Sequence, residues 1–189
     1  MTAPGMPAPP FFTIGHSTRS IEEFTGLLRE AGVEQLVDVR TVPRSRTNPQ
    51  FNRDSLPESL EASAIGYSYL QALGGLRPRS KTVATGVNGF WENASFHNYA
   101  DYALGDDFRA GFAELLALGH HQRSAIMCAE AVWWRCHRRI LADHLLARGE
   151  QVFHILGPGH IEPAMLTRGA VVQADGSVQY PAPQSSLAL

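Results

Sequence analysis

A strand–helix–strand pattern in the first forty residues constrains the fold more than any other feature. Residues 11–14 are an apolar run of strand length, and residues 33–39 are a second segment that is expected to form a strand. Between them, apolar residues recur at helical spacing from Ile21, directly after a Ser20/Glu23 capping box. A βαβ unit of this kind joins parallel strands by a right-handed crossover. The pattern therefore predicts an α/β fold with a mostly parallel sheet flanked by helices.

The alternation of helices and strands continues along the chain. We expect helices at residues 54–65, 97–104, 106–118 and 136–148, and strands at residues 67–70, 124–128 and 152–156. In the first of these helices, Asp54 is the expected cap and Gly66 the expected stop. Asp175-Gly176 between two short runs predicts a C-terminal β-hairpin over residues 170–180. A flavodoxin-like or Rossmann-like strand order is the working expectation.

The domain organisation is simple. Residues 1–10, with four prolines, are expected to be a flexible leader, residues 11–182 a single α/β domain, and residues 183–189 a tail. Residues 74–95 are rich in glycine and polar side chains and are expected to be a structureless insertion, either functional or partly mobile.

Charge and composition exclude several classes of protein. The formal net charge is −2, so no overall field attracts nucleic acid or anionic membrane. The leader carries no basic residue and does not resemble a signal peptide, and no apolar stretch approaches the ~18 residues of a membrane span. Two cysteines are too few for a secreted disulfide scaffold. We expect a cytoplasmic protein without a membrane partner.

The ends of the expected strands carry the candidate site. In open α/β sheets, ligands bind outside the carboxyl ends of the strands. The first strand is followed by His16 and Ser17, and the second ends at Asp38 and Arg40. His16 is an acid/base candidate or a structural histidine, and Ser17 is an anion donor or a turn residue.

A basic loop follows the second strand. If the strand continues through both residues, Asp38 and Arg40 share one face, where they can pair with each other or with neighbours. Arg40, Arg44, Arg46 and Arg53 have no acidic residue among them. This run is either a phosphate clamp or a solvated basic loop.

The segment from Cys128 to Arg138 is the richest in chemistry. A strand leads through a short loop into a helix expected to begin at Cys136. Helix N-termini bind anions and lower the pKa of a nearby thiol, which makes Cys136 a candidate thiolate. Glu130 is a candidate base or nucleophile, and Arg135, Arg138 and Arg139 supply positive charge.

Two other interpretations of the cysteines stay open, a zinc site and a buried core position, whereas the spacing argues against a phosphatase or rhodanese loop. Cys128, Cys136, His137 and His16 offer soft zinc ligands, although their spacing is no recognised zinc pattern. Cys128 and Arg135 are separated by six residues rather than the five of a phosphatase or rhodanese loop. Cys128 also suits a buried core position at a strand end.

The motifs together resemble a known family. Gly15-His16-Ser17, Asp38-Val39-Arg40 followed by Pro43 and Ser45, Leu73-Gly74-Gly75, and Met127-Cys128-x-Glu130 leading to Cys136-His137-Arg138 are similar to the bacterial Domain of Unknown Function 488 family. The resemblance covers about residues 12–156. It implies a stand-alone bacterial α/β domain whose motif residues act together, and it implies no activity.

The leading hypothesis is an enzyme acting on a phosphate-bearing ligand such as a nucleotide or a nucleic-acid component. The catalytic candidates are His16, Glu130, Cys128 and Cys136. The substrate-binding candidates are Ser17, Asp38, Arg40, Ser45, His137 and Arg138. Alternatives are a non-catalytic nucleotide or nucleic-acid binding module, and a Cys/His metal or redox site. No particular cofactor or oligomeric state follows from the sequence.

Overall fold

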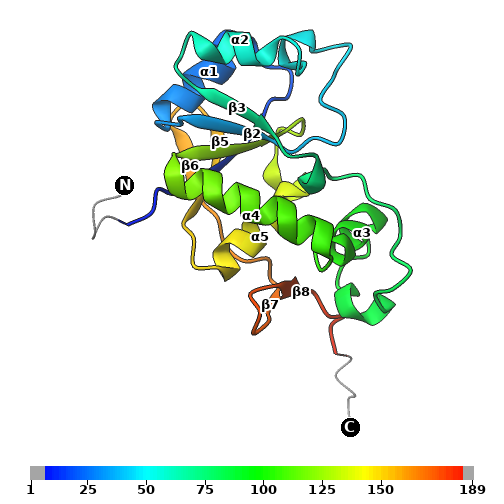
Figure 1. Ribbon diagram of the computed structural model, residues 1–189. Helices are drawn as coiled ribbons and strands as arrows, with labels where there is room; N and C mark the ends of the chain where they lie inside the picture. The colour runs from blue at the N-terminus through cyan, green and yellow to red at the C-terminus, as the bar shows by residue number, and fades with distance from the viewer. Residues whose placement is uncertain (1–6, 185–189) are drawn as a thin grey trace.

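A computed structural model, described here over residues 7–184, contains a six-stranded sheet with helices on both faces (Figure 1). The strands, in sheet order, are β3 (Gly66–Tyr69), β2 (Gln35–Asp38), β4 (Ser124–Cys128), β1 (Phe11–Gly15), β5 (Val152–Gly157) and β6 (His160–Pro163). Only β6 runs antiparallel to its neighbour. A separate hairpin pairs β7 (Val171–Val172) with β8 (Val178–Gln179). The predicted fold class is confirmed, including the C-terminal hairpin.

The strand order differs from both orders that we expected. In the Rossmann and flavodoxin orders, the first two strands of the chain are neighbours. Here β4 lies between β1 and β2 and pairs with both. All five residues of β4 are buried, which suits a central strand. Because fully buried parallel strands look alike in sequence, the order is not readable from the chain alone.

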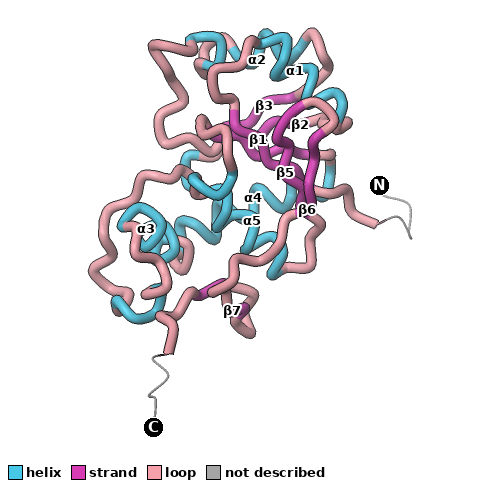
Figure 2. Tube along the Cα trace, turned by 180° about the vertical axis from the view of Figure 1, so that it is seen from behind, coloured by secondary structure: helices cyan, strands magenta, loops and turns pink. Residues whose placement is uncertain are grey.

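The helices divide into two layers that cover opposite faces of the sheet (Figures 1 and 2). One layer contains α1 (Ile21–Glu30) and α2 (Leu56–Glu61), which pack on one hydrophobic cluster. The other contains α4 (Asp106–His121) and α5 (Arg138–Ala147), which pack on a second cluster. The helix α3 (Ala94–Tyr102) joins this cluster beside α5 and does not itself cover the sheet. Short 3-10 turns occupy Pro49–Phe51, Gln71–Leu73, Thr85–Asn88 and Trp133–Arg135.

Helix ends confirm one capping prediction and correct another. The capping box of α1 forms, because Glu23 N–H donates to Ser20 Oγ at 3.1 Å and the Glu23 carboxylate accepts from Ser20 N–H. By contrast, α2 begins two residues after the expected cap, Asp54, and ends well before the expected stop. Gly66 is the first residue of β3, and Ala64 takes the left-handed conformation at φ 55°. The turn is completed by backbone hydrogen bonds to the carbonyls of residues 60 and 61, so glycine is not required there.

The long segment 74–95 is not structureless, contrary to expectation. Asn88 within it is fully buried, donates to Asp101 at 2.7 Å and accepts from the Tyr180 N–H at 2.9 Å. Trp91 is also buried and stacks on Phe96 of α3. The segment is therefore attached to α3 and to the end of the last hairpin, which explains why it needs little secondary structure of its own.

Other expectations are tested only in part. No helix within residues 7–184 is both long and apolar enough to cross a membrane. The expected leader and tail fall largely outside the described residues, and the single-domain boundary at residues 11–182 stays a prediction. β6, which the sequence analysis did not predict, extends the sheet beyond β5 as an antiparallel edge.

The chain leaves the parallel strands β1 and β4 toward opposite faces of the sheet. After β1 the chain enters α1 on one face of the sheet, and after β4 it enters α5 on the other face. β1 and β4 are neighbours, with Gly15 opposite Cys128. Such a switch point leaves a crevice at the carboxyl ends of the two strands. The candidate site is therefore expected beside Gly15 and Cys128.

Candidate functional site

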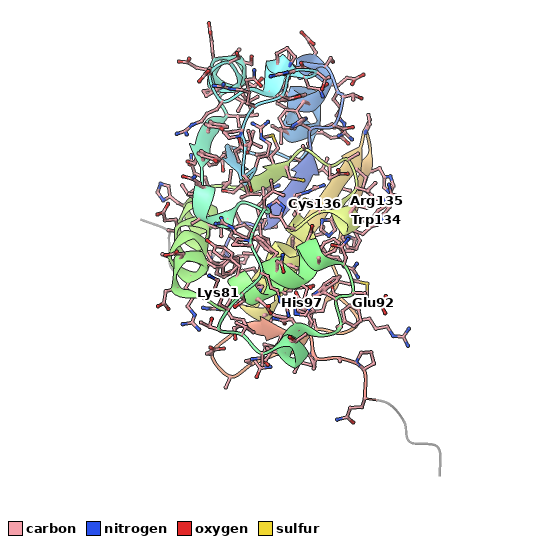
Figure 3. The ribbon with its side chains drawn as sticks, turned by 90° about the vertical axis from the view of Figure 1, so that its right-hand side faces the viewer. Lys81, Glu92, His97, Trp134, Arg135 and Cys136 are labelled. Atoms are coloured by element: carbon pink, nitrogen blue, oxygen red, sulfur yellow. The ribbon has the colours of Figure 1, made fainter. Side chains whose placement is uncertain are left out.

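A cavity of about 400 Å³ opens at this edge of the sheet. Loops that follow β2, β3 and β4, together with the start of α3, form its wall. The residues that line it are Arg40, Thr41, Val42, Gly75, Leu76, Asn93, Ser95, Phe96, Cys128, Ala129, Glu130, Arg135, Cys136 and His137. Figure 3 shows Trp134, Arg135 and Cys136 grouped on the loop between β4 and α5. Residues from three of the predicted motifs thus meet in one cavity.

The two cysteines are in direct contact. The Sγ atoms of Cys128 and Cys136 are 2.7 Å apart, and both thiols are free and buried. Cys128 ends β4, whereas Cys136 lies just before α5, which begins at Arg138 rather than at the expected Cys136. The Arg138 N–H donates to Cys136 Sγ at 3.4 Å. The N-terminus of α5 is therefore an anion site inside the protein, and the sulfur of Cys136 occupies it.

A hydrogen bond from one ring nitrogen of His137 turns the other ring nitrogen toward Cys136. Its Nε2 donates to the Val39 carbonyl at 2.9 Å, which leaves Nδ1 to face Cys136 Sγ at 3.4 Å. The backbone of Gly75 lies against the same ring, and Tyr99 contacts its edge. The imidazole is thus held on several sides, with one nitrogen available to the thiol.

Arg138 is a buried cation without a carboxylate partner. Its side chain is 1 % exposed and donates to the Glu130 carbonyl at 2.7 Å and to Thr13 Oγ1 at 3.2 Å. Its Nε has no hydrogen-bond partner, and none of the ion pairs within residues 7–184 includes it. A buried guanidinium requires a nearby negative charge. The adjacent sulfur atoms are the groups that can supply it.

The pKa shifts agree with this assignment. Burial by itself would raise the pKa of Cys136, but the hydrogen bond to Cys128 and the neighbouring His137 and Arg138 outweigh it and hold that pKa well below its ordinary value. Burial and the hydrogen bond to Cys136 raise the pKa of Cys128 well above its ordinary value. Burial disfavours the charge of Arg138, yet the two sulfur groups outweigh burial and raise its pKa. These opposite shifts favour the thiolate form at Cys136 and the thiol form at Cys128.

Behind Arg138 lies a small neutral network that the sequence analysis missed. Thr13 Oγ1 and His154 Nδ1 are 2.7 Å apart, and the His154 ring stacks on Trp133. Burial, followed by the charge of Arg138, lowers the pKa of His154 to about 3, so this histidine stays neutral and supplies no competing charge. The available signal was a single hydroxyl residue, Thr13, in the middle of an apolar strand.

Asp38 and Arg40 pair with each other, as one of the two alternatives predicted. The Asp38 carboxylate accepts from Arg40 Nε at 2.9 Å and Nη2 at 2.7 Å, and from the Tyr67 hydroxyl. Arg40 also donates to the Phe51 carbonyl at 2.7 Å. Asp38 is fully buried and Arg40 is 5 % exposed. Most of the donors of Arg40 are therefore used within the protein, although it borders the cavity.

His16 lies behind the cavity wall rather than in it. Its Nδ1 donates to the Ser17 carbonyl at 2.8 Å, and its Nε2 lies 3.3 Å from Arg40 Nη1, from which it accepts. The ring stacks on Phe51. Burial, and to a lesser extent Arg40, lowers the pKa of His16, while the bond to Ser17 opposes this. The geometry is that of a neutral histidine that positions Arg40.

Several other candidates are not brought to the cavity. Ser17 takes φ 50° and pairs its N–H with the Ala129 carbonyl. Ser45 Oγ accepts from the Asn48 N–H within its own loop. The side chains of Arg44, Arg46 and Arg53 are exposed and do not line the cavity. Glu130, in contrast, is at the rim with an exposed side chain.

The four proposed zinc ligands do not form one site, because Cys128, Cys136 and His137 are in contact whereas His16 is held elsewhere. Within the described part of the chain, no group of three or more His, Cys, Asp or Glu side chains is arranged to hold a metal ion. Both ring nitrogens of His16 are engaged by Ser17 and Arg40, which removes it from the set. The contact between Cys128 and Cys136 is thus a thiol pair rather than half of a tetrahedral site.

A substitution at Gly75 tests the placement of His137. A Cβ atom there would lie 2.4 Å from His137 Nδ1, so the ring must move in Gly75→Ala. We expect alkylation of Cys136 at pH 6 to slow by about tenfold, the effect of raising a thiol pKa by about one unit. Gly86→Ala is the matched control, because nothing lies within 4 Å of its Cβ position. Equal alkylation rates in the two variants would contradict the role assigned to His137.

Comparison with known proteins gives one match. A family model described as Domain of unknown function DUF488 matches residues 20–145. The matched range includes the loops that line the cavity and ends within α5, whereas His16 and Ser17 lie before it. No curated protein and no solved structure matches the chain.

Proposed function

This chain belongs to the family described as Domain of unknown function DUF488, which carries no activity with it, and we propose a function from the cavity itself. The protein is a thiol-dependent transferase or hydrolase that acts on a small phosphate-bearing ligand. The observation that carries the proposal is the buried Arg138 without a carboxylate partner, beside a pair of thiols that line a cavity.

Cys136 is the nucleophile in this proposal. Thiolates, not thiols, attack electrophilic carbon or phosphorus, and enzymes favour the thiolate with adjacent positive charge. Arg138 supplies a fixed charge, and the Nδ1 of His137 lies 3.4 Å from Cys136 Sγ. Since the sulfur borders the cavity, a bound ligand reaches it without rearrangement of the backbone.

The rim of the cavity supports a ligand that is part anionic and part apolar. Arg135 is exposed at the rim, and its side chain makes no hydrogen bond or ion pair with another residue in the range 7–184. Its planar guanidinium suits a phosphate group. Val42, Leu76 and Phe96 form an apolar wall suited to the base of a nucleotide.

The reaction follows from these positions. The Cys136 thiolate attacks the electrophilic centre and forms a bond to sulfur, while the leaving group departs with its electron pair and takes a proton from His137. Glu130 at the rim then takes a proton from the water that displaces the sulfur, which restores the thiolate. Glu130 releases that proton to solvent and His137 takes one up from solvent, so both residues regain their starting state. Asp38 and His16 hold Arg40 in place and take no part in the proton transfers.

The test begins with a thermal-shift screen of phosphate-bearing metabolites, followed by a turnover assay on the hits. We expect Cys136→Ser to abolish turnover and Glu130→Ala to lower it by about 10²–10⁴-fold, the usual size of an acid/base contribution. Arg135→Ala is expected to weaken binding, whereas Arg46→Ala, an exposed arginine away from the cavity, is the matched control. Turnover that survives in Cys136→Ser would remove the nucleophile from the mechanism.

The thiolate is testable without a substrate. We expect iodoacetamide to modify Cys136 before Cys128, with a rate that is already near its plateau below the ordinary thiol pKa of about 8.5. The direction follows from the lowered pKa of Cys136 and the raised pKa of Cys128. His137→Gln is expected to move the pH midpoint of alkylation upward. A rate that rises through pH 8.5 as for a free cysteine would contradict the thiolate assignment.

A further inference from the structure

We propose that Cys128 and Cys136 form a redox pair that reduces low-molecular-weight disulfides, with Cys136 as the attacking sulfur and Cys128 as the resolving sulfur. The inference shares only the Cys136 thiolate with the proposed function and needs no phosphate ligand. It is carried by the placement of the two sulfur atoms, 2.7 Å apart, in the wall of an open cavity.

The geometry allows the bond to close with little movement. The sulfur atoms of a disulfide are about 2.05 Å apart, so a shift of less than about 1 Å brings the pair to bonding distance. Cys128 is fixed at the end of a central strand, and Cys136 is held by the Arg138 N–H at the start of α5. Neither element has to unfold for the disulfide to form.

The surroundings divide the roles between the two sulfur atoms. Cys136 contacts His137 Nδ1 and the Arg138 N–H, whereas Cys128 contacts only the Glu130 carbonyl, at 3.8 Å, besides its partner. The Arg138 guanidinium acts on both sulfur atoms, but the His137 ring and the Arg138 N–H favour a negative charge on Cys136 in particular. Cys136 attacks first for this reason.

Arg138 links the attack of Cys136 on the substrate disulfide to the later attack of Cys128 on the Cys136 sulfur. In the reduced protein its buried charge lies beside the thiol pair, whose negative charge the His137 ring and the Arg138 N–H favour on Cys136. Once Cys136 is bonded to a sulfur of the substrate, that negative charge is gone while Arg138 remains. The nearest group that can replace it is Cys128, whose deprotonation is then favoured. The same cation therefore activates first one sulfur and then the other.

The steps balance in atoms and electrons. The Cys136 thiolate attacks a substrate disulfide R–S–S–R, forming a mixed disulfide and releasing R–S⁻. The released R–S⁻ takes the proton of Cys128 and leaves as R–SH. The Cys128 thiolate then attacks the Cys136 sulfur, closing the protein disulfide and releasing the second R–S⁻. The substrate gains two electrons and the protein pair loses two.

The chain offers a clean experiment, because it contains only two cysteines. The reduced full-length protein is treated with oxidised glutathione, and its intact mass and free thiols are measured. We expect the wild type to lose both thiols and two hydrogen atoms in mass, with no retained glutathione, and to recover both thiols on addition of a dithiol. Cys128→Ser is expected to accumulate a stable glutathione adduct on Cys136. Cys136→Ser has lost the sulfur that His137 Nδ1 and the Arg138 N–H contact, so it is expected to react at least about tenfold more slowly.

A stable adduct on the wild-type protein, a disulfide only between two chains, or no reaction would each overturn the redox pair. The wild-type measurement alone decides the matter if a cysteine variant does not fold. Because the assay contains no phosphate ligand, its failure leaves the turnover assay of the proposed function unaffected. Loss of that turnover activity would equally leave disulfide closure intact.

Discussion

Replacing Asp38 with alanine is expected to lower the free energy of unfolding by about 3–5 kcal/mol, the cost of leaving a buried partner charge uncompensated. Asp38 is fully buried and Arg40 is 5 % exposed, so water cannot replace the lost carboxylate. The variant also deprives the Tyr67 hydroxyl of its acceptor. Urea unfolding monitored by circular dichroism measures the change in the free energy of unfolding.

Asp54→Ala is the matched control for Asp38→Ala. Its carboxylate lies 4.0 Å from Arg44 Nη2 in an ion pair whose side chains are 72 % and 86 % exposed. Such a surface pair contributes about 0–1 kcal/mol, so this variant is expected to unfold nearly as the wild type does. If Asp38→Ala lowers the free energy of unfolding by no more than Asp54→Ala does, Arg40 is not held by Asp38 as described.

Gly15→Ala is expected to disrupt the site and the fold together. A Cβ atom at this position would lie 1.6 Å from the Glu130 carbonyl oxygen and 2.5 Å from its carbon, both backbone atoms. The loop after β4 must therefore move away from the end of β1, which breaks the hydrogen bond from Arg138 to the Glu130 carbonyl. We expect a loss of at least about 1–3 kcal/mol from overpacking, together with slow alkylation of Cys136.

Gly26→Ala is a control in which the free energy of unfolding is expected to change in the opposite direction. Gly26 lies within α1, and nothing is found within 4 Å of its Cβ position. Alanine at such a helical position is expected to stabilise the protein by about 0.5–1 kcal/mol. Urea unfolding of both variants separates the clash at Gly15 from the general effect of adding a methyl group. Similar changes in the free energy of unfolding for the two variants would contradict the close contact between Gly15 and the Glu130 carbonyl.

Much of the site could be predicted from the sequence because its residues are local to strand ends. Cys128 and Cys136 were placed beside the same cavity from the strand–loop–helix pattern, together with His137. The pairing of Asp38 with Arg40 is one of the two alternatives that side-chain alternation predicted, although β2 ends at Asp38 and Arg40 lies just beyond it. These inferences need only local geometry and the rule that parallel strands present their carboxyl ends to one edge.

The remaining features depend on contacts between distant segments. The engagement of His16 by Arg40 requires the loop that brings Phe51 against its ring, and nothing near His16 in the chain indicates it. The contact of Gly75 with His137 joins segments about sixty residues apart in the chain. The strand order, which determines both contacts, is hidden because β1, β2 and β4 are all fully buried and differ little in pattern.

The insertion of β4 between β1 and β2 has a consequence for how this chain folds. Both sheet partners of β1, β4 and β5, lie beyond residue 123, so the first strand has nothing to pair with during synthesis of the first half of the chain. Closing such long-range contacts carries a large loop entropy and slows folding. Nascent chains of this protein are therefore expected to expose an unpaired apolar strand, and to need protection from aggregation, until the last third has been made.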